Sequence, residues 1–179
     1  LYLVPDDDTV ARAALLRSLM AELFQAEKSA ELHCEREARR HRAHTFPMTQ
    51  GRLPSASLWT LSRQARASLA ILHQLAAARG FKLAPKARGL GVVFSQVREL
   101  VVDRLWSSER SWRATLLGLR HGVDVALSLR MVAEAAGDDA VAVFCDGLLR
   151  ARVPLVAEVE NSLWWFAEHP RLALEAALG

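Results

Sequence analysis

The amino-acid sequence predicts an all-α fold, because its composition and the spacing of its apolar residues both favour helices. Alanine, leucine and arginine dominate the 179 residues, whereas threonine, isoleucine and tyrosine are scarce, which leaves little material for strands. Apolar residues recur every three or four positions over residues 9–44, 56–79, 108–136 and 140–167. This spacing places them on one face of each helix, so we expect an antiparallel bundle of four long helices.

The chain is predicted to form a single helical domain over residues 1–179. A hydrophobic content of 51% is enough for one substantial core, and no shift in composition marks a second domain. Two shorter helices are expected as well. Residues 92–106 would form one of them inside a long crossover, and residues 171–178 would form the other after the fourth long helix.

The long helices are expected to pair in order as two hairpins. Residues 6–8 are aspartates that complement the dipole of the first helix, with Thr9 as a capping residue, and Gly80 ends the second helix. The turn over residues 137–139 joins the third helix to the fourth. Pro154 predicts a kink in the fourth helix, because proline removes an amide donor and crowds the preceding turn.

Glu27 is the most informative residue, because it occupies a core position. The inward stripe of the first helix reads Leu16, Met20, Leu23, Glu27, Ala30, Cys34 and His41. A buried carboxylate is costly unless it is paired with a cation, hydrogen-bonded or bound to a metal. The sequence therefore predicts a polar site inside the bundle, and it leaves open whether an arginine, protonation or a hydrogen-bonding neighbour neutralises Glu27.

Two hairpins joined by a long crossover, with a glutamate inside the first helix, resemble the ferritin-like four-helix bundle. The di-iron members of that superfamily carry a glutamate on the first and third helices and Glu-x-x-His on the second and fourth. Glu27 is similar to the glutamate of the first helix. In the second helix His73 matches the histidine, but Ala70 stands where the glutamate would be.

The third and fourth helices also depart from the pattern that the resemblance implies. Asp124, or alternatively Glu109, would replace the glutamate of the third helix, and Asn161 stands three residues after Glu158 in place of the histidine. Two irons need about six protein ligands, so these departures argue against an ordinary di-iron oxidase or iron-storage site.

We therefore expect a non-catalytic ferritin-like bundle that acts in protein–protein interaction or self-association, with no cofactor. The alternative is an atypical metal-binding or redox member, which would hold iron, manganese or zinc through a reduced set of ligands. Those ligands would be Glu27, His73, Asp124 and Glu158. The sequence has no glycine-rich phosphate loop, no Gly-x-Ser-x-Gly and no His-Glu-x-x-His, so it favours a protein that is not an enzyme, although catalytic groups far apart in sequence leave no local signature.

Several residues are candidates for an interface between helices or between molecules. One narrow stripe cannot bury consecutive large side chains, so at least one of Trp164, Trp165 and Phe166 should meet another surface. That surface is either the crossover or tail of the same chain, or a dimer or partner protein. Gly118 and Gly122 are four residues apart and would let another helix approach closely.

Charge and cysteine content limit the partners and the cellular location that we expect. The net charge of +3 comes from arginines scattered among 20 acidic residues, and no aromatic residues interleave the basic cluster near residue 40, so nucleic acid is not an expected partner. His41 and His44 lie one turn apart, but the arginines beside them favour a solvated basic helix end over a surface metal site. Two cysteines within helical patterns fit a reduced, cytoplasmic setting, and no apolar run reaches the roughly 18 residues of a membrane span.

Overall fold

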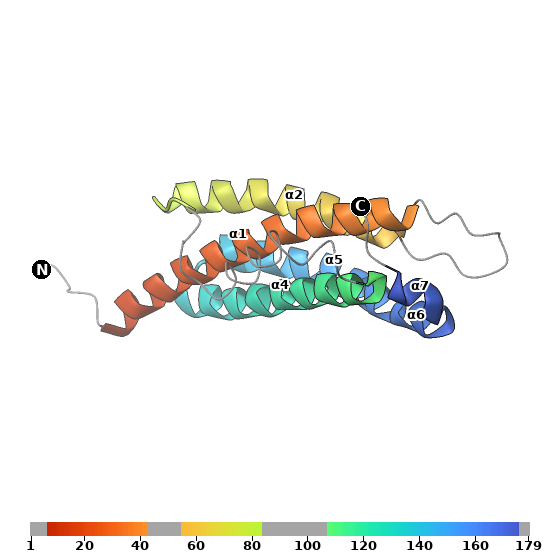
Figure 1. The fold of residues 1–179 in the computed structure, drawn as a ribbon. Helices are drawn as coiled ribbons and strands as arrows, with labels where there is room; N and C mark the ends of the chain where they lie inside the picture. The colour runs from red at the N-terminus through yellow and green to blue at the C-terminus, as the bar shows by residue number, and fades with distance from the viewer. Residues whose placement is uncertain (1–6, 43–54, 84–106, 176–179) are drawn as a thin grey trace, which may run out of the picture.

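The computed structural model describes residues 7–42, 55–83 and 107–175, and its helices form an elongated bundle (Figure 1). The predicted all-helical bundle of about four long helices is confirmed. The helices are α1 (Asp7–Arg42), α2 (Ser55–Ala78), α4 (Ser108–Ala136), α5 (Asp139–Asn161), α6 (Leu163–Glu168) and α7 (Pro170–Leu174). No helix within these described ranges combines the length and the apolar character needed to cross a membrane.

The first hairpin consists of α1 and α2, which run antiparallel. Arg66 Nε of α2 lies 2.6 Å from Glu31 Oε1 near the middle of α1. Further along α2, the ring of His73 lies edge-on to Phe24, with 4.7 Å between ring centroids. Residue numbers therefore rise on α2 as they fall on α1, which is the arrangement expected for a hairpin.

The second hairpin consists of α4 and α5, joined by a tight turn. Gly137 adopts a left-handed φ of 68° and donates its backbone N–H to carbonyl groups of the last turn of α4. This conformation favours glycine, because a Cβ atom would come too close to the backbone. Asp138 then caps α5, since its Oδ1 accepts a hydrogen bond from the Val141 N–H at 3.2 Å.

The two hairpins pack so that α1 lies next to α4 and α2 lies next to α5. At one end of the bundle Arg79, just after α2, is paired with Asp138 at the start of α5. At the other end Ser111, in the first turn of α4, hydrogen-bonds Glu37 of α1. The helices α2 and α4 therefore run in the same direction, and the end of α2 and the start of α4 lie at opposite ends of the bundle (Figure 1).

The fourth long helix is shorter than the sequence predicts. We expected one helix over residues 140–167, but α5 ends at Asn161 and α6 starts at Leu163. The hydroxyl of Ser162 donates to the Glu158 carbonyl at 2.8 Å, which supplies a partner for the end of α5. Ser162 keeps a right-handed helical conformation, and Phe166 of α6 packs into the core.

Two further expectations about the helices can be placed. The last predicted helix, over residues 171–178, corresponds to α7, which ends at Leu174. Pro154 lies inside α5 and is exposed, and its predicted kink stays a prediction. The crossover and the short helix predicted over residues 92–106 lie outside the described residues.

The core consists of two apolar clusters along the length of the bundle. One is built around Trp112 and Phe166, near the start of α4. The other is built around Met20 and Leu129, towards the turn between α4 and α5. A single polar level separates the two clusters, and this level carries the candidate site.

Candidate functional site

The polar level contains an ion pair between Glu27 of α1 and Arg152 of α5. Arg152 Nη1 donates to Glu27 Oε1 at 3.0 Å, and Arg152 Nη2 donates to Glu27 Oε2 at 2.7 Å. The side chains of Arg152 and Glu27 are only 2% and 1% exposed. Because α1 and α5 are not neighbours in the bundle, the two side chains meet across its diagonal, inside the core.

The other two helices provide small residues at this level. Gly122 of α4 is buried, and a Cβ atom there would lie 3.8 Å from Glu27 Oε1 and 3.7 Å from Ala26 Cβ. Ser68 of α2 is buried between Ala65, which belongs to one apolar cluster, and Leu72, which belongs to the other. Small residues on α2 and α4 thus leave room for the two long side chains from α1 and α5.

The ion pair answers the question that the sequence left open, since an arginine neutralises Glu27. The geometry is the two-point fork that matches a guanidinium to a carboxylate. Arg152 Nε is buried and has no hydrogen-bond partner within the described residues. Removing one member of such a buried pair leaves the other charge without a partner in the core, which lowers stability by about 3–5 kcal/mol.

Arg152 was missed by the sequence reasoning, although the signal for it was present. The buried residues of α5 are Val141, Cys145, Leu148, Arg152, Val156 and Val159. Their spacing of three or four residues is the same core stripe that singled out Glu27, and Arg152 interrupts it in the same way. A search for charged residues on every apolar stripe would have found both members of the pair.

The remaining residues of the metal hypothesis are spread over the bundle surface. His73 is exposed beside Phe24, Asp124 is exposed on α4, and the exposed Glu158 accepts a hydrogen bond from Ser57 of α2. In the part of the chain that the structure describes, no group of three or more histidine, cysteine, aspartate or glutamate side chains could hold a metal ion. The four predicted ligands are therefore not brought together, and Glu27 alone among them lies in the polar level.

A second buried polar cluster lies where the end of α1 meets the start of α4. Arg40 Nη1 donates to Glu37 Oε1 at 2.7 Å and contacts Ser111 Oγ at 2.8 Å, and Ser111 also donates to Glu37. His41 Nε2 lies 3.3 Å from Glu37 Oε2, and the His41 ring packs edge-on to Trp112. These contacts tie the first hairpin to the second at this end of the bundle.

The second cluster corrects the expectation of a solvated basic end on α1. The side chains of Arg40 and His41 are only 9% and 5% exposed, because α4 and α6 cover them. Arg39 alone of these fits the expectation, since it is exposed and paired with Glu35. His44 lies outside the described residues.

The carboxyl group of Glu37 has a pKa below its ordinary value of 4.5. Burial by itself raises this pKa, but hydrogen bonds with His41 and Ser111 and the positive charge of Arg40 together outweigh burial. Glu37 is therefore a carboxylate in the folded protein at neutral pH.

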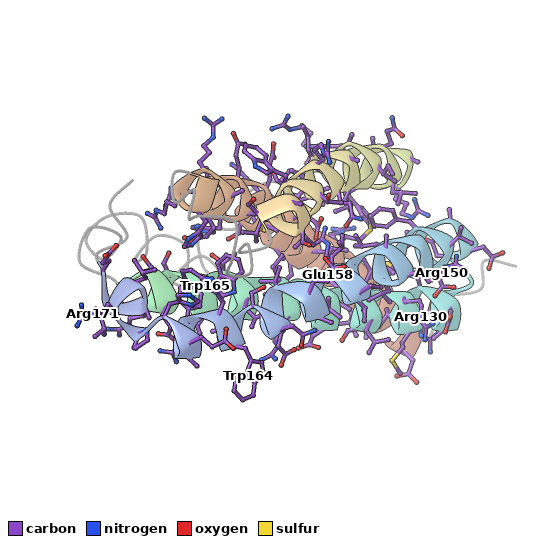
Figure 2. The ribbon with its side chains drawn as sticks, turned by 90° about the vertical axis from the view of Figure 1, so that its right-hand side faces the viewer. Arg130, Arg150, Glu158, Trp164, Trp165 and Arg171 are labelled. Carbon is purple, nitrogen blue, oxygen red and sulfur yellow. The ribbon has the colours of Figure 1, made fainter. Side chains whose placement is uncertain are left out.

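The predicted interface residues divide into buried and exposed ones. Phe166 and Gly122 are buried, and Trp165 is partly buried with its ring stacked 4.4 Å from the ring of His169. Gly118 is partly buried on α4, and a Cβ built on it would have no atom within 4 Å other than those of its chain neighbours and the nearby backbone of α4. Trp164 is 75% exposed and points away from the bundle (Figure 2), as expected for one of these large side chains.

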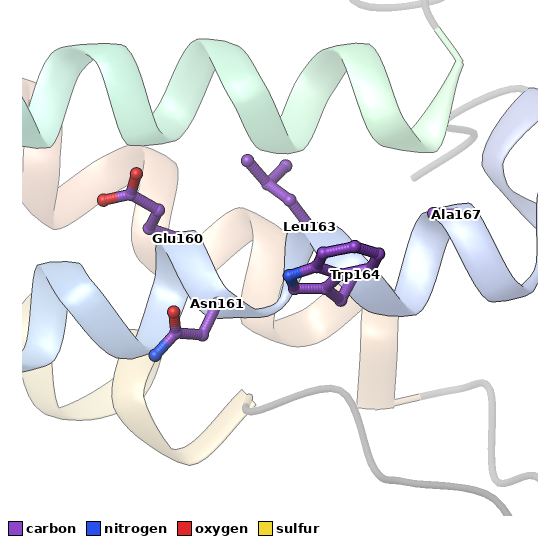
Figure 3. Close-up of a pocket in the computed structure, with 5 residues that line it drawn as sticks. All are labelled: Glu160, Asn161, Leu163, Trp164 and Ala167. Atoms are coloured by element: carbon purple, nitrogen blue, oxygen red, sulfur yellow. The ribbon is translucent and has the colours of Figure 1, made fainter.

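Trp164 lines an open hollow of about 350 Å³ where α5 gives way to α6 (Figure 3). The other lining residues are Glu160, Asn161, Leu163 and Ala167. An indole exposed beside a carboxylate and an amide is the kind of surface on which a protein partner finds both apolar area and hydrogen-bonding groups.

Comparisons of the chain with protein families, with curated proteins and with solved structures gave no match. The fold and the site therefore define the class of protein directly: an all-helical bundle of about four long helices with an internal ion pair and an exposed tryptophan.

Proposed function

We propose that this chain is a ferritin-like bundle that acts by associating with a second protein surface and that does so without a metal cofactor. The topology supports the ferritin-like part of the proposal. Two antiparallel hairpins are arranged so that α2 and α4 run in the same direction, and ferritin-like bundles reach that arrangement through one long crossover.

The observation that carries the proposal is the closed ion pair between Glu27 and Arg152. A carboxylate at this level of a ferritin-like bundle would be the natural ligand for a cation in the core. Here both oxygens of Glu27 accept hydrogen bonds from Arg152. The guanidinium thus supplies, from the chain itself, the positive charge that a metal would otherwise bring.

The surface supports the part of the proposal that concerns association. Trp164 is largely exposed beside an open hollow, although an indole normally gains by burial. Tryptophan is also among the residues that contribute most to binding at protein interfaces. An interaction surface gives this side chain a role that the isolated bundle does not.

The test combines elemental analysis with a solution mass, on protein purified without a histidine tag. We expect iron, manganese and zinc far below one atom per chain, and a mass above the 19.8 kDa of one chain that a chelator leaves unchanged. One metal per chain that is lost in the exposed variants Asp124→Asn or Glu158→Gln would overturn the proposal in favour of a metal protein. A metal-free chain that stays monomeric would contradict self-association.

A further inference from the structure

The outward face of the α4–α5 hairpin carries a row of exposed apolar side chains. Leu117, Leu127 and Met131 of α4, Val153 of α5 and Trp164 of α6 are between 42% and 75% exposed. On α4, Leu117, Leu127 and Met131 are ten and four residues apart, so they lie on one side of that helix. The row runs over about 21 Å of α4, from Leu117 to Met131, at 1.5 Å per residue.

Two ion pairs on this face cross the seam between α4 and α5. Arg120 is paired with Glu160, and Arg130 Nη1 lies 3.0 Å from Asp146 Oδ1. In both pairs the arginine belongs to α4 and the acid to α5, and all four side chains are at least one-third exposed. The ion pairs alternate with the apolar residues along the face.

Two more charged residues lie on this face, and here the acid belongs to α4 and the arginine to α5. Asp124 of α4 and Arg150 of α5 are both exposed, and neither has an ion-pair partner within residues 7–42, 55–83 and 107–175. The face is therefore balanced in charge, which disfavours nucleic acid or an anionic membrane as its occupant and favours a protein surface with the same alternation.

We propose that a second copy of the chain covers this face, related by a two-fold axis parallel to the helices. That rotation places α4 of one copy over α5 of the other at the same height along the bundle. Arg120 then faces Glu160 of the second copy, and Arg130 faces Asp146 of the second copy. Leu127 faces Val153 of the second copy, so apolar residues meet apolar residues between the charged levels.

The charges favour this axis over the other two-fold axis that would bury the same face. An axis perpendicular to the helices would place α4 against α4 in opposite directions. Arg120 would then face Arg130 of the second copy, and Asp146 would face Glu160 of the second copy. Like charges that face each other across an interface oppose association.

This inference rests on the proposed function, since it names the partner of the association and the face that binds it. The test uses the charge reversals Arg120→Glu and Glu160→Arg, each measured alone and then in an equal mixture, by analytical ultracentrifugation. Each variant alone places like charges across the dimer, and we expect its dissociation constant to rise about tenfold or more. In the mixture, Glu at 120 of one chain faces Arg at 160 of the other, so association should return.

The mixture is decisive because it repairs the contact between chains without repairing the contact within either chain. The double variant Arg120→Glu/Glu160→Arg should dimerise like the original protein. Arg63→Glu, an equal change at an exposed position of α2, is the matched control and should leave the dissociation constant unchanged. Circular dichroism establishes that every variant keeps its helical content.

Three outcomes would overturn the inference. They are a monomeric original protein, a dimer whose dissociation constant none of the variants changes, and a mixture that associates no better than its components. The second outcome assigns the interface to another face and leaves the proposed function standing. The proposed function fails separately, if the protein holds about one metal atom per chain; a metal-free monomer overturns this inference and leaves association with a different protein.

Discussion

Replacing Arg152 by methionine should destabilise the bundle severely, because it leaves the Glu27 carboxylate alone in the core. Glu27 is 1% exposed, and the Arg152 guanidinium donates to both of its oxygens. Breaking a buried ion pair by removing one partner costs about 3–5 kcal/mol. Domains of this kind have a total free energy of unfolding of about 5–15 kcal/mol, so the loss would be a large share of it.

The double variant Glu27→Leu/Arg152→Met gives the opposite expectation. Replacing both members with apolar side chains of similar size removes two buried charges together, and such replacements are neutral or stabilise by about 1–4 kcal/mol. The double variant should therefore be more stable than either single variant. The coupling between the two positions is the quantity that the structure predicts to be large.

Equilibrium urea denaturation followed by circular dichroism measures these free energies. The matched control is Arg66→Met, which removes the exposed partner of Glu31 on the same two helices that form the first hairpin and should change stability little. If Arg152→Met were as mild as Arg66→Met, or if the effects of the single changes at 27 and 152 simply added, the buried ion pair would be refuted.

Three further predictions follow from individual residues. The pKa of Glu37 is lower in the folded protein than its ordinary value of 4.5. Its carboxylate therefore stabilises the fold above pH 4.5, and this contribution disappears as the pH falls through the folded-state pKa. Glu37→Gln should make the acid limb of a stability–pH curve shallower. Burial raises the pKa of the Cys145 thiol to about 12, so a thiol reagent at mildly alkaline pH should modify Cys145 only at the rate of unfolding, and rapid modification in the native state would contradict its burial. Gly137→Ala should lower the free energy of unfolding by about 1–2 kcal/mol, because φ there is 68°. Gly118→Ala should raise the free energy of unfolding by about 0.5–1 kcal/mol, because Gly118 lies inside α4 and no side chain or other helix comes within 4 Å of the new Cβ. Equal shifts of the two variants in thermal melts would contradict both backbone assignments.

The helices could be predicted from the sequence because apolar spacing is a local signal. The stripe through Leu16, Met20 and Leu23 fixes which side of α1 faces inward, and the position of Glu27 on that side follows directly. Gly137 likewise marks the turn between α4 and α5, since its left-handed conformation is a local property of the chain.

The partners of charged residues were harder to predict, because they depend on which helices face each other. Glu27 and Arg152 are 125 residues apart, and they meet only because α1 and α5 occupy opposite corners of the bundle. The burial of Arg40 and His41 depends in the same way on α4 and α6 covering the end of α1. Sequence spacing on one helix carries no information about which other helices bury its side chains.

The division of the fourth helix could not be predicted from periodicity either. The apolar pattern over residues 140–167 continues through Ser162, so periodicity alone predicts one helix. In the structure α5 ends at Asn161, and Phe166 of α6 packs against Trp112, with 5.8 Å between the ring centroids. The interruption spans Ser162 alone, whose hydroxyl donates to the Glu158 carbonyl, and an apolar pattern carries no signal for such a hydrogen bond.

The most direct test of the central claim is the metal content of the native protein, measured by elemental analysis after purification without a tag. If Arg152 supplies the positive charge that Glu27 requires, iron, manganese and zinc should each be far below one atom per chain. About one metal atom per chain, retained through purification and lost when Glu27 is replaced by glutamine in a variant that still folds, would contradict the account.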